Sequence, residues 1–403
     1  MNETADAATT SRPADFDPLA TDVVDAVRDV YRELQAHRPV AWTNAYGGFW
    51  ALTRYEDVRD VASDSRTFIS SVRAVVPSDP RGLRRPPLNF DAPLHTPYRR
   101  ALDHTLQRRR LVRLTEPLRR HARETLAPLL EAGEGDIVRG FGSLFPAWVT
   151  AEWLNLDLDD APRLARLAAE WVDAWRRQDA QMVNTRSGEM YDMARALVAD
   201  RMQHPRPIEE DPASSLLAER HDGQPLDPEQ IVGALRQSLV VGMVAPPIVL
   251  GAIVEHLGTD LDLQARLRAE PALIPAAIEE FIRLYTPYRG FARTAAHRVE
   301  LHGRVIQPAE PITLVYAAAN RDPDMFADPD EFILDRDNIH EHLGFGRGRH
   351  RCAGMALARL SLRIAIETLL ESTVEFTATP ATRFAQMPEL GPTTLQVRLT
   401  ARA

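Results

Sequence analysis

The stretch "GFGRGRHRCAGMALARL", residues 344–360, contains the single cysteine of the 403-residue chain, Cys352. Cys352 follows a segment rich in glycine and arginine and precedes an apolar run that predicts a buried helix. Gly346, Gly348 and Gly354 permit tight turns and a close approach of the backbone to a flat ligand. A lone cysteine is usually a small buried hydrophobe, and these polar surroundings favour a different role.

The residues around Cys352 favour a metal-binding thiolate. The start of a helix offers unpaired N–H groups and the positive end of the helix dipole, and both stabilise a thiolate. His350 and the arginines beside it add positive charge. Because the chain has no second cysteine, a zinc or iron–sulfur site would have too few soft ligands. A single thiolate suits iron held in a macrocycle, whose nitrogen atoms supply the other ligands.

The segment "FGRGRHRCAG", residues 345–354, resembles the haem-binding loop of the cytochrome P450 family, and every fixed position of that pattern is present. The resemblance implies that Cys352 is the proximal thiolate ligand of haem b and that Phe345 shields its sulfur. It also implies that His350 helps to hold the cofactor, and it places Gly346 and Gly354 in the cofactor-binding loop.

Further motifs extend the resemblance from about residue 17 to the C-terminus. "EFIR" supplies the Glu-x-x-Arg pair of the family, Glu280 and Arg283, on one helical face. Arg336 in "FADPDEFILDR" is expected to join them in a structural network behind the haem. The segments "DAPLHTPYRR" and "GFARTA" imply three partners of the haem propionates, which charge-assisted hydrogen bonds would hold: His95, Arg99 and Arg293.

One segment departs from the pattern of the family. The helix over the haem usually carries a small-Gly-x-acid-Thr run, and this chain reads "VVGMVAPP". Alignment on Gly242 puts Val244 at the acid and Ala245 at the threonine, with Pro246 next, and these are the predicted catalytic positions. Valine and alanine have no exchangeable proton, so they cannot supply protons during the activation of dioxygen.

Three explanations for this departure stay open. A hydroxyl or carboxyl group of the substrate could deliver protons through a water held by backbone carbonyls near Pro246 and Pro247. The enzyme could use peroxide instead of dioxygen. It could also catalyse coupling, dealkylation or rearrangement rather than hydroxylation.

The family resemblance implies a monooxygenase that oxidises a small organic substrate, aromatic, terpenoid or another secondary metabolite. Electrons would come from a ferredoxin and its ferredoxin reductase. The alternative from another class is a non-catalytic haem-binding module with the same fold. We expect a cytoplasmic monomer.

Composition excludes several other classes. The net charge of −9 argues against a nucleic-acid binder, which needs a basic surface. The chain has no lysine, so Schiff-base chemistry and a phosphate-binding P-loop are excluded. The apolar segment "SLVVGMVAPPIVLGAIV", residues 238–254, is short for a membrane span and contains adjacent prolines. We expect it to form a buried, kinked helix, with no contact to a membrane.

Helical periodicity dominates the chain and predicts a mainly α fold with a smaller β portion. We expect a single haem domain over residues 17–403, preceded by a disordered arm at residues 1–16. "RVELHGRVI" and "PITLVYAA" predict a small sheet, and the C-terminal tail predicts a β-hairpin.

Two surfaces are also predicted. The walls of the substrate pocket are expected at residues 70–89, 171–186, 240–248 and 287–291 and near Met387. Arginines in these walls, such as Arg176 and Arg177, admit an acidic substrate. The basic cluster Arg108, Arg109, Arg110 and Arg113 is expected either to dock the ferredoxin or to be a solvated helix face.

Overall fold

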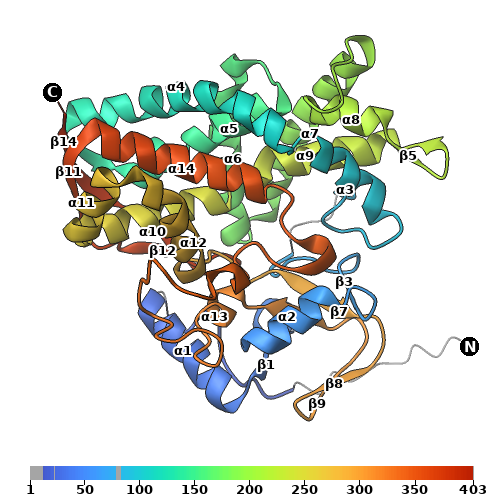
Figure 1. Ribbon diagram of the computed structural model, residues 1–403. Coiled ribbons are helices and arrows are strands. Elements are labelled where there is room, and N and C mark those ends of the chain that lie inside the picture. The colour runs from blue at the N-terminus through green and yellow to red at the C-terminus, as the bar shows by residue number, and fades with distance from the viewer. Residues whose placement is uncertain (1–11, 22, 79–82, 403) are drawn as a thin grey trace, which may run out of the picture.

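A computed structural model describes residues 12–21, 23–78 and 83–402 of the chain. Most of these residues form helices, and a smaller part forms strands, as Figure 1 shows. The helices are α1 Val24–His37, α2 Tyr55–Ser63, α3 His95–His104, α4 Arg108–Ala132, α5 Phe145–Leu154, α6 Ala161–Arg176, α7 Ala180–Gln203, α8 Pro212–Ala218, α9 Pro228–Val241, α10 Ala245–Thr259, α11 Leu261–Ala269, α12 Ile274–Leu284, α13 Tyr316–Ala319 and α14 Met355–Ser372. The predicted fold class, mainly α with a smaller β portion, is confirmed.

The strands form one larger sheet and several small ones. They are β1 Val40–Thr43, β2 Phe49–Leu52, β3 Phe68–Ile69, β4 Glu134–Asp136, β5 Arg220–His221, β6 Gln224–Pro225, β7 Ala292–Ala295, β8 Val299–Leu301, β9 Arg304–Ile306, β10 Pro311–Leu314, β11 Thr373–Ala378, β12 Arg383–Ala385, β13 Gly391–Thr394 and β14 Gln396–Ala401. The five-stranded sheet has the order β1-β2-β10-β7-β3, in which only β2 and β10 pair in parallel.

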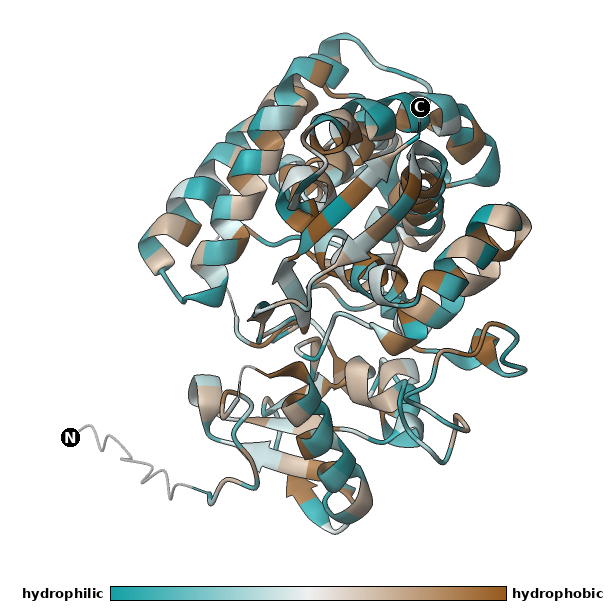
Figure 2. Cartoon of the chain, turned by 90° about the vertical axis from the view of Figure 1, so that its left-hand side faces the viewer, coloured by the Kyte–Doolittle hydropathy of each residue, from teal (hydrophilic) through white to brown (hydrophobic). Residues whose placement is uncertain are grey.

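Alternation of side chains along β2 explains how this sheet is covered on both faces. Trp50 and Leu52 belong to the apolar cluster that contains Val58 and Val61 of α2. Phe49 and Ala51, which point to the other face, belong to the cluster of α1. The sheet therefore lies between α1 and α2, in the lower part of the molecule in Figures 1 and 2, and the larger helical part lies above it.

The apolar helix α14 anchors the larger, helical part. It packs along α4 and against α12, and Leu362, Ile366 and Leu369 belong to the main hydrophobic cluster. In Figure 2 the hydrophobic residues of this part face inward and the hydrophilic residues face outward. Because α14 follows Cys352 directly, this packing fixes the position of the cysteine.

The apolar segment around residue 240 is broken rather than bent at its prolines. α9 ends at Val241 and α10 begins at Ala245, so the break falls at residues 242–244. Pro246 and Pro247 lie in the first turn of α10, where the missing N–H groups have no helical partner to lose. The predicted kink is therefore displaced toward the N-terminus. Within the described residues, only the stretch Pro228–Thr259 is long and apolar enough to cross a membrane, and 72% of its most apolar window is buried inside the protein.

The C-terminal tail forms two nested strand pairs instead of the single predicted hairpin. β12 and β13 form the inner pair, and β11 and β14 form the outer one. β14 also pairs with β4, a strand that lies far away in the sequence. This long-range partner, together with breakers at Pro380 and Pro388, accounts for the difference.

The predicted arm at residues 1–16 falls in part outside the described residues, which begin at Arg12. Its described end is packed against the sheet. The guanidinium carbon of Arg12 lies 4.4 Å from the ring centroids of both Trp42 and Trp50. Asp15 accepts hydrogen bonds from the Trp42 amide at 2.7 Å and from Arg304 at 2.7 Å. Cation–π contacts and an ion pair therefore hold these residues on the domain.

A buried ionic network ties α12 to the segment that leads to Cys352. Arg283 donates to both carboxylate oxygens of Glu280, at 2.7 and 2.8 Å, and Arg336 Nε donates to Glu280 Oε1 at 3.0 Å. Arg283 also donates to the carbonyl groups of Asn320 and Pro329. The predicted network of Glu280, Arg283 and Arg336 is confirmed, and its members are at most 7% exposed.

Replacement of Arg283 by alanine should lower the free energy of unfolding by about 3–5 kcal/mol, because it leaves the Glu280 carboxylate buried without its main partner. Urea denaturation of the purified protein measures this change. Arg123→Ala is the matched control, since its ion pair with Glu371 is exposed on both sides and should contribute less than about 1 kcal/mol. Equal losses in the two variants would contradict the structural role of the network.

Candidate functional site

The loop that carries Cys352 has a backbone that favours glycine at two positions. Gly346 and Gly348 have φ angles of 67° and 72°, in the left-handed region that favours glycine. A Cβ atom on Gly348 would lie 2.3 Å from the carbonyl oxygen of Ala62. The Cys352 amide donates to the Phe345 carbonyl at 2.8 Å and closes the loop.

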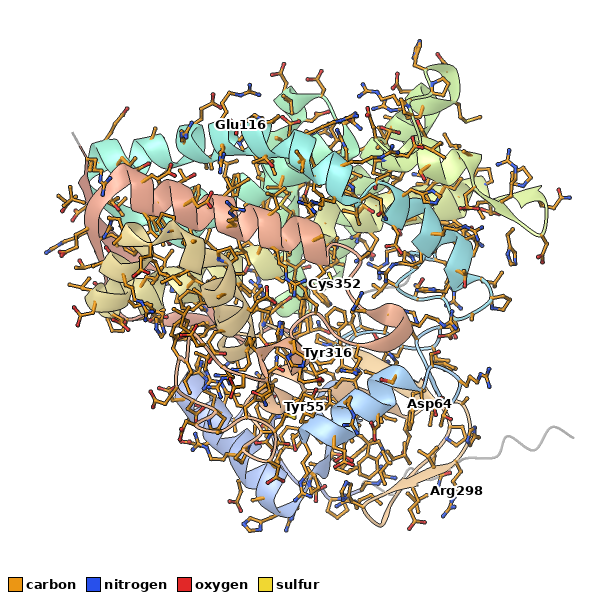
Figure 3. The ribbon with its side chains drawn as sticks, viewed as in Figure 1. Tyr55, Asp64, Glu116, Arg298, Tyr316 and Cys352 are labelled. Carbon is orange, nitrogen blue, oxygen red and sulfur yellow. The ribbon has the colours of Figure 1, made fainter. Side chains whose placement is uncertain are left out.

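The thiol of Cys352 lies deep in the protein and is nevertheless accessible. Figure 3 shows it at the start of α14, in the middle of the molecule. Burial raises the pKa of the thiol, and this effect outweighs the opposing effects of the Gly354 amide and of Arg99, Arg359 and Arg351. The sequence suggested that the helix terminus and the arginines stabilise a thiolate. In the structure, these groups do not produce a free thiolate by themselves. A bound metal ion deprotonates a coordinating thiol outright.

Near this thiol lies a cluster of buried groups with no carboxylate at hydrogen-bond distance within the described residues. The rings of His95, the first residue of α3, and His350 are 4.6 Å apart. Within the described part of the chain, His95 Nδ1 and His350 Nε2 are buried without a hydrogen-bond partner. The Asp91 carboxylate is 3.8 Å from His350 Nε2, too far for a hydrogen bond. Burial, together with His350 and Arg99, lowers the pKa of His95 to about 3.

Arg293 on β7 belongs to the same cluster and is 4% exposed. Its guanidinium donates to the carbonyl of Ala292 at 2.9 Å, and burial lowers the pKa of this guanidinium. A buried guanidinium normally requires an anionic partner. A flat iron macrocycle with two carboxylate side chains would supply iron to the thiol and anions to His95, His350 and Arg293. The residues present therefore fit a haem.

Arg99 is oriented differently from the other predicted propionate partners. Its Nε donates to Asp103 at 2.8 Å, and its Nη1 donates to the carbonyl of Arg351 at 2.5 Å. The guanidinium thus braces α3 against the cysteine loop. Its predicted contact with a propionate stays a prediction.

Phe345 is held by a second ionic group behind the loop. The Arg359 guanidinium lies 4.8 Å from the centroid of the Phe345 ring and donates to both oxygens of Glu279, at 2.6 and 2.7 Å. His342 lies 3.1 Å from the same carboxylate. Burial alone would raise the pKa of Glu279, but hydrogen bonds from His342 and Arg359 lower it to about 2. Glu279 was not among the predicted site residues, although it is adjacent to Glu280.

Of the predicted catalytic positions, Ala245 and Pro246 are partly exposed and Val244 is buried. Val241 is 46% exposed although most of α9 is buried, and Ala245, one turn later, and Pro246 are partly exposed. Val244 is only 5% exposed and packs in the main hydrophobic cluster. A Cβ atom on Gly242 would lie 2.7 Å from Thr150 Oγ1, so glycine is required there by close packing. Ala245 and Pro246 border the open space, and neither carries a proton donor.

The predicted pocket walls come together in space. Val75 and Phe291 form an isolated β-bridge, and Tyr288 and Glu389 form another. Arg176, the last residue of α6, donates to Glu389 Oε2 at 2.9 Å. These segments were predicted from the sequence, but Glu389 was not. Its position two residues after Met387, in the tip of the tail, could have indicated it.

A basic groove of about 830 Å³ lies on the surface beside the cysteine loop. Its lining includes one acidic side chain, Asp103, and six arginines: Arg99, Arg100, Arg347, Arg349, Arg351 and Arg359.

The basic cluster that the sequence marked at the start of α4 is largely neutralised. Arg109 and Arg113 form ion pairs with Glu209 and Glu210. Arg110 donates to the Glu152 carbonyl at 3.1 Å and to Asn155 at 3.1 Å. Carboxylates from the α7–α8 connection supply the compensating charge, which local sequence does not show.

Comparisons with known proteins agree with this geometry. The family model described as Cytochrome P450 matches residues 211–390. The chain is 32% identical over 351 residues to a mycinamicin IV hydroxylase/epoxidase from Micromonospora griseorubida, covering 85% of this chain and 86% of the relative. It is 28% identical to a linalool 8-monooxygenase from Pseudomonas putida, with 85% and 87% covered. The structure of the cytochrome P450 CYP109Q5 from Chondromyces apiculatus matches with a TM-score of 0.86 at 25% identity, covering 96% of this chain and 99% of that one.

Glu279→Gln should reduce the free energy of unfolding by about 2–3 kcal/mol at pH 7, because hydrogen bonds in the folded state hold the Glu279 pKa at about 2, well below its usual value. A depressed carboxylate pKa stabilises the fold above the unfolded pKa and loses this effect as the pH falls. The difference between the native protein and the variant should therefore shrink from about pH 4.5 to about pH 2. Chemical denaturation at a series of pH values measures it. Glu116→Gln, an exposed control, should show little change, and a pH-independent difference for Glu279→Gln would refute the assignment.

Proposed function

The chain belongs to the cytochrome P450 family and is a monooxygenase, and we propose that it holds haem b through Cys352 to oxidise a small organic substrate. The observation that carries this proposal is the accessible thiol at the protein centre beside His95, His350 and Arg293, which are buried with no carboxylate at hydrogen-bond distance within the described residues. The relatives named as hydroxylases, epoxidases and monooxygenases argue against a non-catalytic haem-binding module.

Each of these residues has a separate task in this proposal. The haem, when bound, supplies the oxidising chemistry. Cys352 ligates its iron, and Phe345, clamped by Arg359, keeps water and polar groups away from the sulfur. His95, His350 and Arg293 would donate hydrogen bonds to the two propionates, which would satisfy their buried N–H groups. Gly346 and Gly348 allow the loop to approach the ring closely.

Electrons are proposed to come from a ferredoxin, itself reduced by a ferredoxin reductase. Arg349 and Arg351 in the basic groove support this proposal, because they lie beside the cysteine loop and suit an acidic partner. The other groove arginines, Arg99, Arg100, Arg347 and Arg359, already pair with carboxylates. The cluster of Arg109 and Arg113 is less suitable, since its charges already face Glu209 and Glu210. We keep a cytoplasmic monomer as the expected state.

Protons are proposed to come from the substrate. Val244 is buried in the hydrophobic cluster and Ala245 has no donor, so the chain offers no acid or alcohol at these positions. A hydroxyl or amine on the substrate, with a water near the helix break at residues 242–244, would fill the gap. The same absence supports peroxide use as a second candidate, because peroxide already carries the protons that dioxygen must gain.

The substrate is proposed to be a secondary metabolite or terpenoid. This rests on the relatives named for mycinamicin IV and for linalool. Coupling, dealkylation and rearrangement remain the other reactions open to such an enzyme.

Cys352→His tests the ligand assignment. The native protein, reduced and exposed to carbon monoxide, should give a thiolate-type spectrum, and the variant should lose it because imidazole replaces sulfur at the iron. Haem content and far-ultraviolet circular dichroism serve as controls for folding. A thiolate-type spectrum in the variant would show that Cys352 is not the ligand.

Reversal of two groove charges, Arg349→Glu with Arg351→Glu, should slow reduction by an acidic [2Fe–2S] ferredoxin by about tenfold or more at low salt. The effect should fade as salt screens exposed charges beyond about 8–10 Å. Stopped-flow reduction measures the rate, and peroxide-driven turnover checks that the site is intact. The matched control reverses Arg109 and Arg113, whose charges are already paired. A larger effect in this control would show that the ferredoxin docks at the start of α4 and not at the groove.

A further inference from the structure

Glu389, at the turn between β12 and β13, is a buried carboxylate with one unused oxygen. The residue is 0% exposed. Arg176 Nε donates to its Oε2 at 2.9 Å, but Oε1 is buried and has no hydrogen-bond partner within the described residues. A buried acceptor that lacks a donor is costly, and the cost is greatest for a charged group. The site is therefore incomplete without a donor that the described chain does not provide.

Glu389 lies where predicted walls of the substrate pocket meet. Its β-bridge partner is Tyr288, and the side chains of directly opposed residues project to the same side of a strand pair. The amide of Arg289 donates to the Pro388 carbonyl and the amide of Leu390 donates to the Pro287 carbonyl, so this backbone pairing is fixed on both sides. Arg176 adds the end of α6 to the same cluster.

Tyr288 is a member of this cluster that reaches accessible surface. It is only partly buried, whereas Glu389 opposite it is fully buried. Burial raises the pKa of Tyr288 well above its usual value, and Glu389, Arg176 and Cys352 all act on it. The phenol therefore stays protonated.

The arginines near this cluster are already engaged. Arg177, next to Arg176 on α6, forms an ion pair with Asp173. Arg186 is shared between Glu170 and Glu189. Arg289 donates to the Tyr31 hydroxyl and to the Pro18 carbonyl, on the side of α1. These pairings leave Arg176 and Arg177 without a free charge for an acidic substrate.

We propose that Glu389 Oε1 accepts a hydrogen bond from a hydroxyl or protonated amine of the substrate, with Arg176 and Tyr288 positioning the carboxylate. The enzyme then prefers neutral alcohols and amines over carboxylic acids. This proposal rests on the proposed function, because it assigns the polar end of the same pocket. It makes Glu389 a specificity-determining residue and Arg176 its positioning residue.

Three probes of one shape test the preference: 1-adamantanol, 1-adamantylammonium and adamantane-1-carboxylate. Equilibrium dialysis of the holoenzyme at neutral pH gives their dissociation constants without turnover. The alcohol and the ammonium should bind about tenfold or more tightly than the carboxylate, because Oε1 attracts donors and repels an anion. Glu389→Gln should weaken ammonium binding by about tenfold or more and bring the carboxylate close to the alcohol. Arg123→Met, which removes an exposed ion pair outside the predicted pocket walls, should leave all three constants unchanged.

The preference of the native enzyme tests the proposal even where Glu389→Gln fails to fold. Equal binding of the three probes, tighter binding of the carboxylate, or no binding of any probe at millimolar concentration would overturn it. Unchanged constants in a folded Glu389→Gln variant would overturn it as well. Failure of the proposed function is distinguishable, because it would appear as loss of the thiolate-type carbon monoxide spectrum in the same native preparation.

Discussion

The hydrogen bond from the Cys352 amide to the Phe345 carbonyl closes the loop on which the chemistry of this protein depends. Glycines with positive φ allow the turn, and the packing of α14 along α4 fixes where the turn ends. The buried network of Glu280, Arg283 and Arg336 holds the segment that leads into the loop. Together these contacts keep a thiol accessible in the middle of a fold whose interior is otherwise closely packed, which metal ligation needs and a merely structural cysteine does not.

The same fold leaves two kinds of buried polar group without a suitable partner among the described residues. Buried donors at His95, His350 and Arg293 need anions, and a haem bears them. The buried acceptor Glu389 Oε1 needs a donor, and Ala245 offers no proton where the family usually has an alcohol. A substrate with a hydroxyl or amine would donate a hydrogen bond to Glu389 and supply the missing proton donor. Substrate recognition and proton delivery are therefore linked.

Much of the site could be predicted from local sequence, because the cysteine loop, the Glu-x-x-Arg pair and the His95 segment are short motifs of fixed spacing. Other features depend on partners far apart in the chain. Glu209 and Glu210 neutralise the arginines of α4, Arg176 pairs with Glu389, and β4 joins the C-terminal strands. The helix break falls at residues 242–244 instead of at Pro246 and Pro247, because prolines are well accommodated in the first turn of α10. Local sequence patterns do not determine these features, because they depend on tertiary packing.

The most direct test of the account is the ratio of oxidised product to released hydrogen peroxide, measured for a hydroxylated substrate and its deoxy analogue. If the substrate supplies protons, the analogue should bind yet give a product-to-peroxide ratio about tenfold or more lower, given the usual contribution of a placed proton donor. Ala245→Thr should raise the ratio for the analogue more than for the parent. Equal ratios for the two compounds in the unmodified enzyme would contradict proton delivery by the substrate.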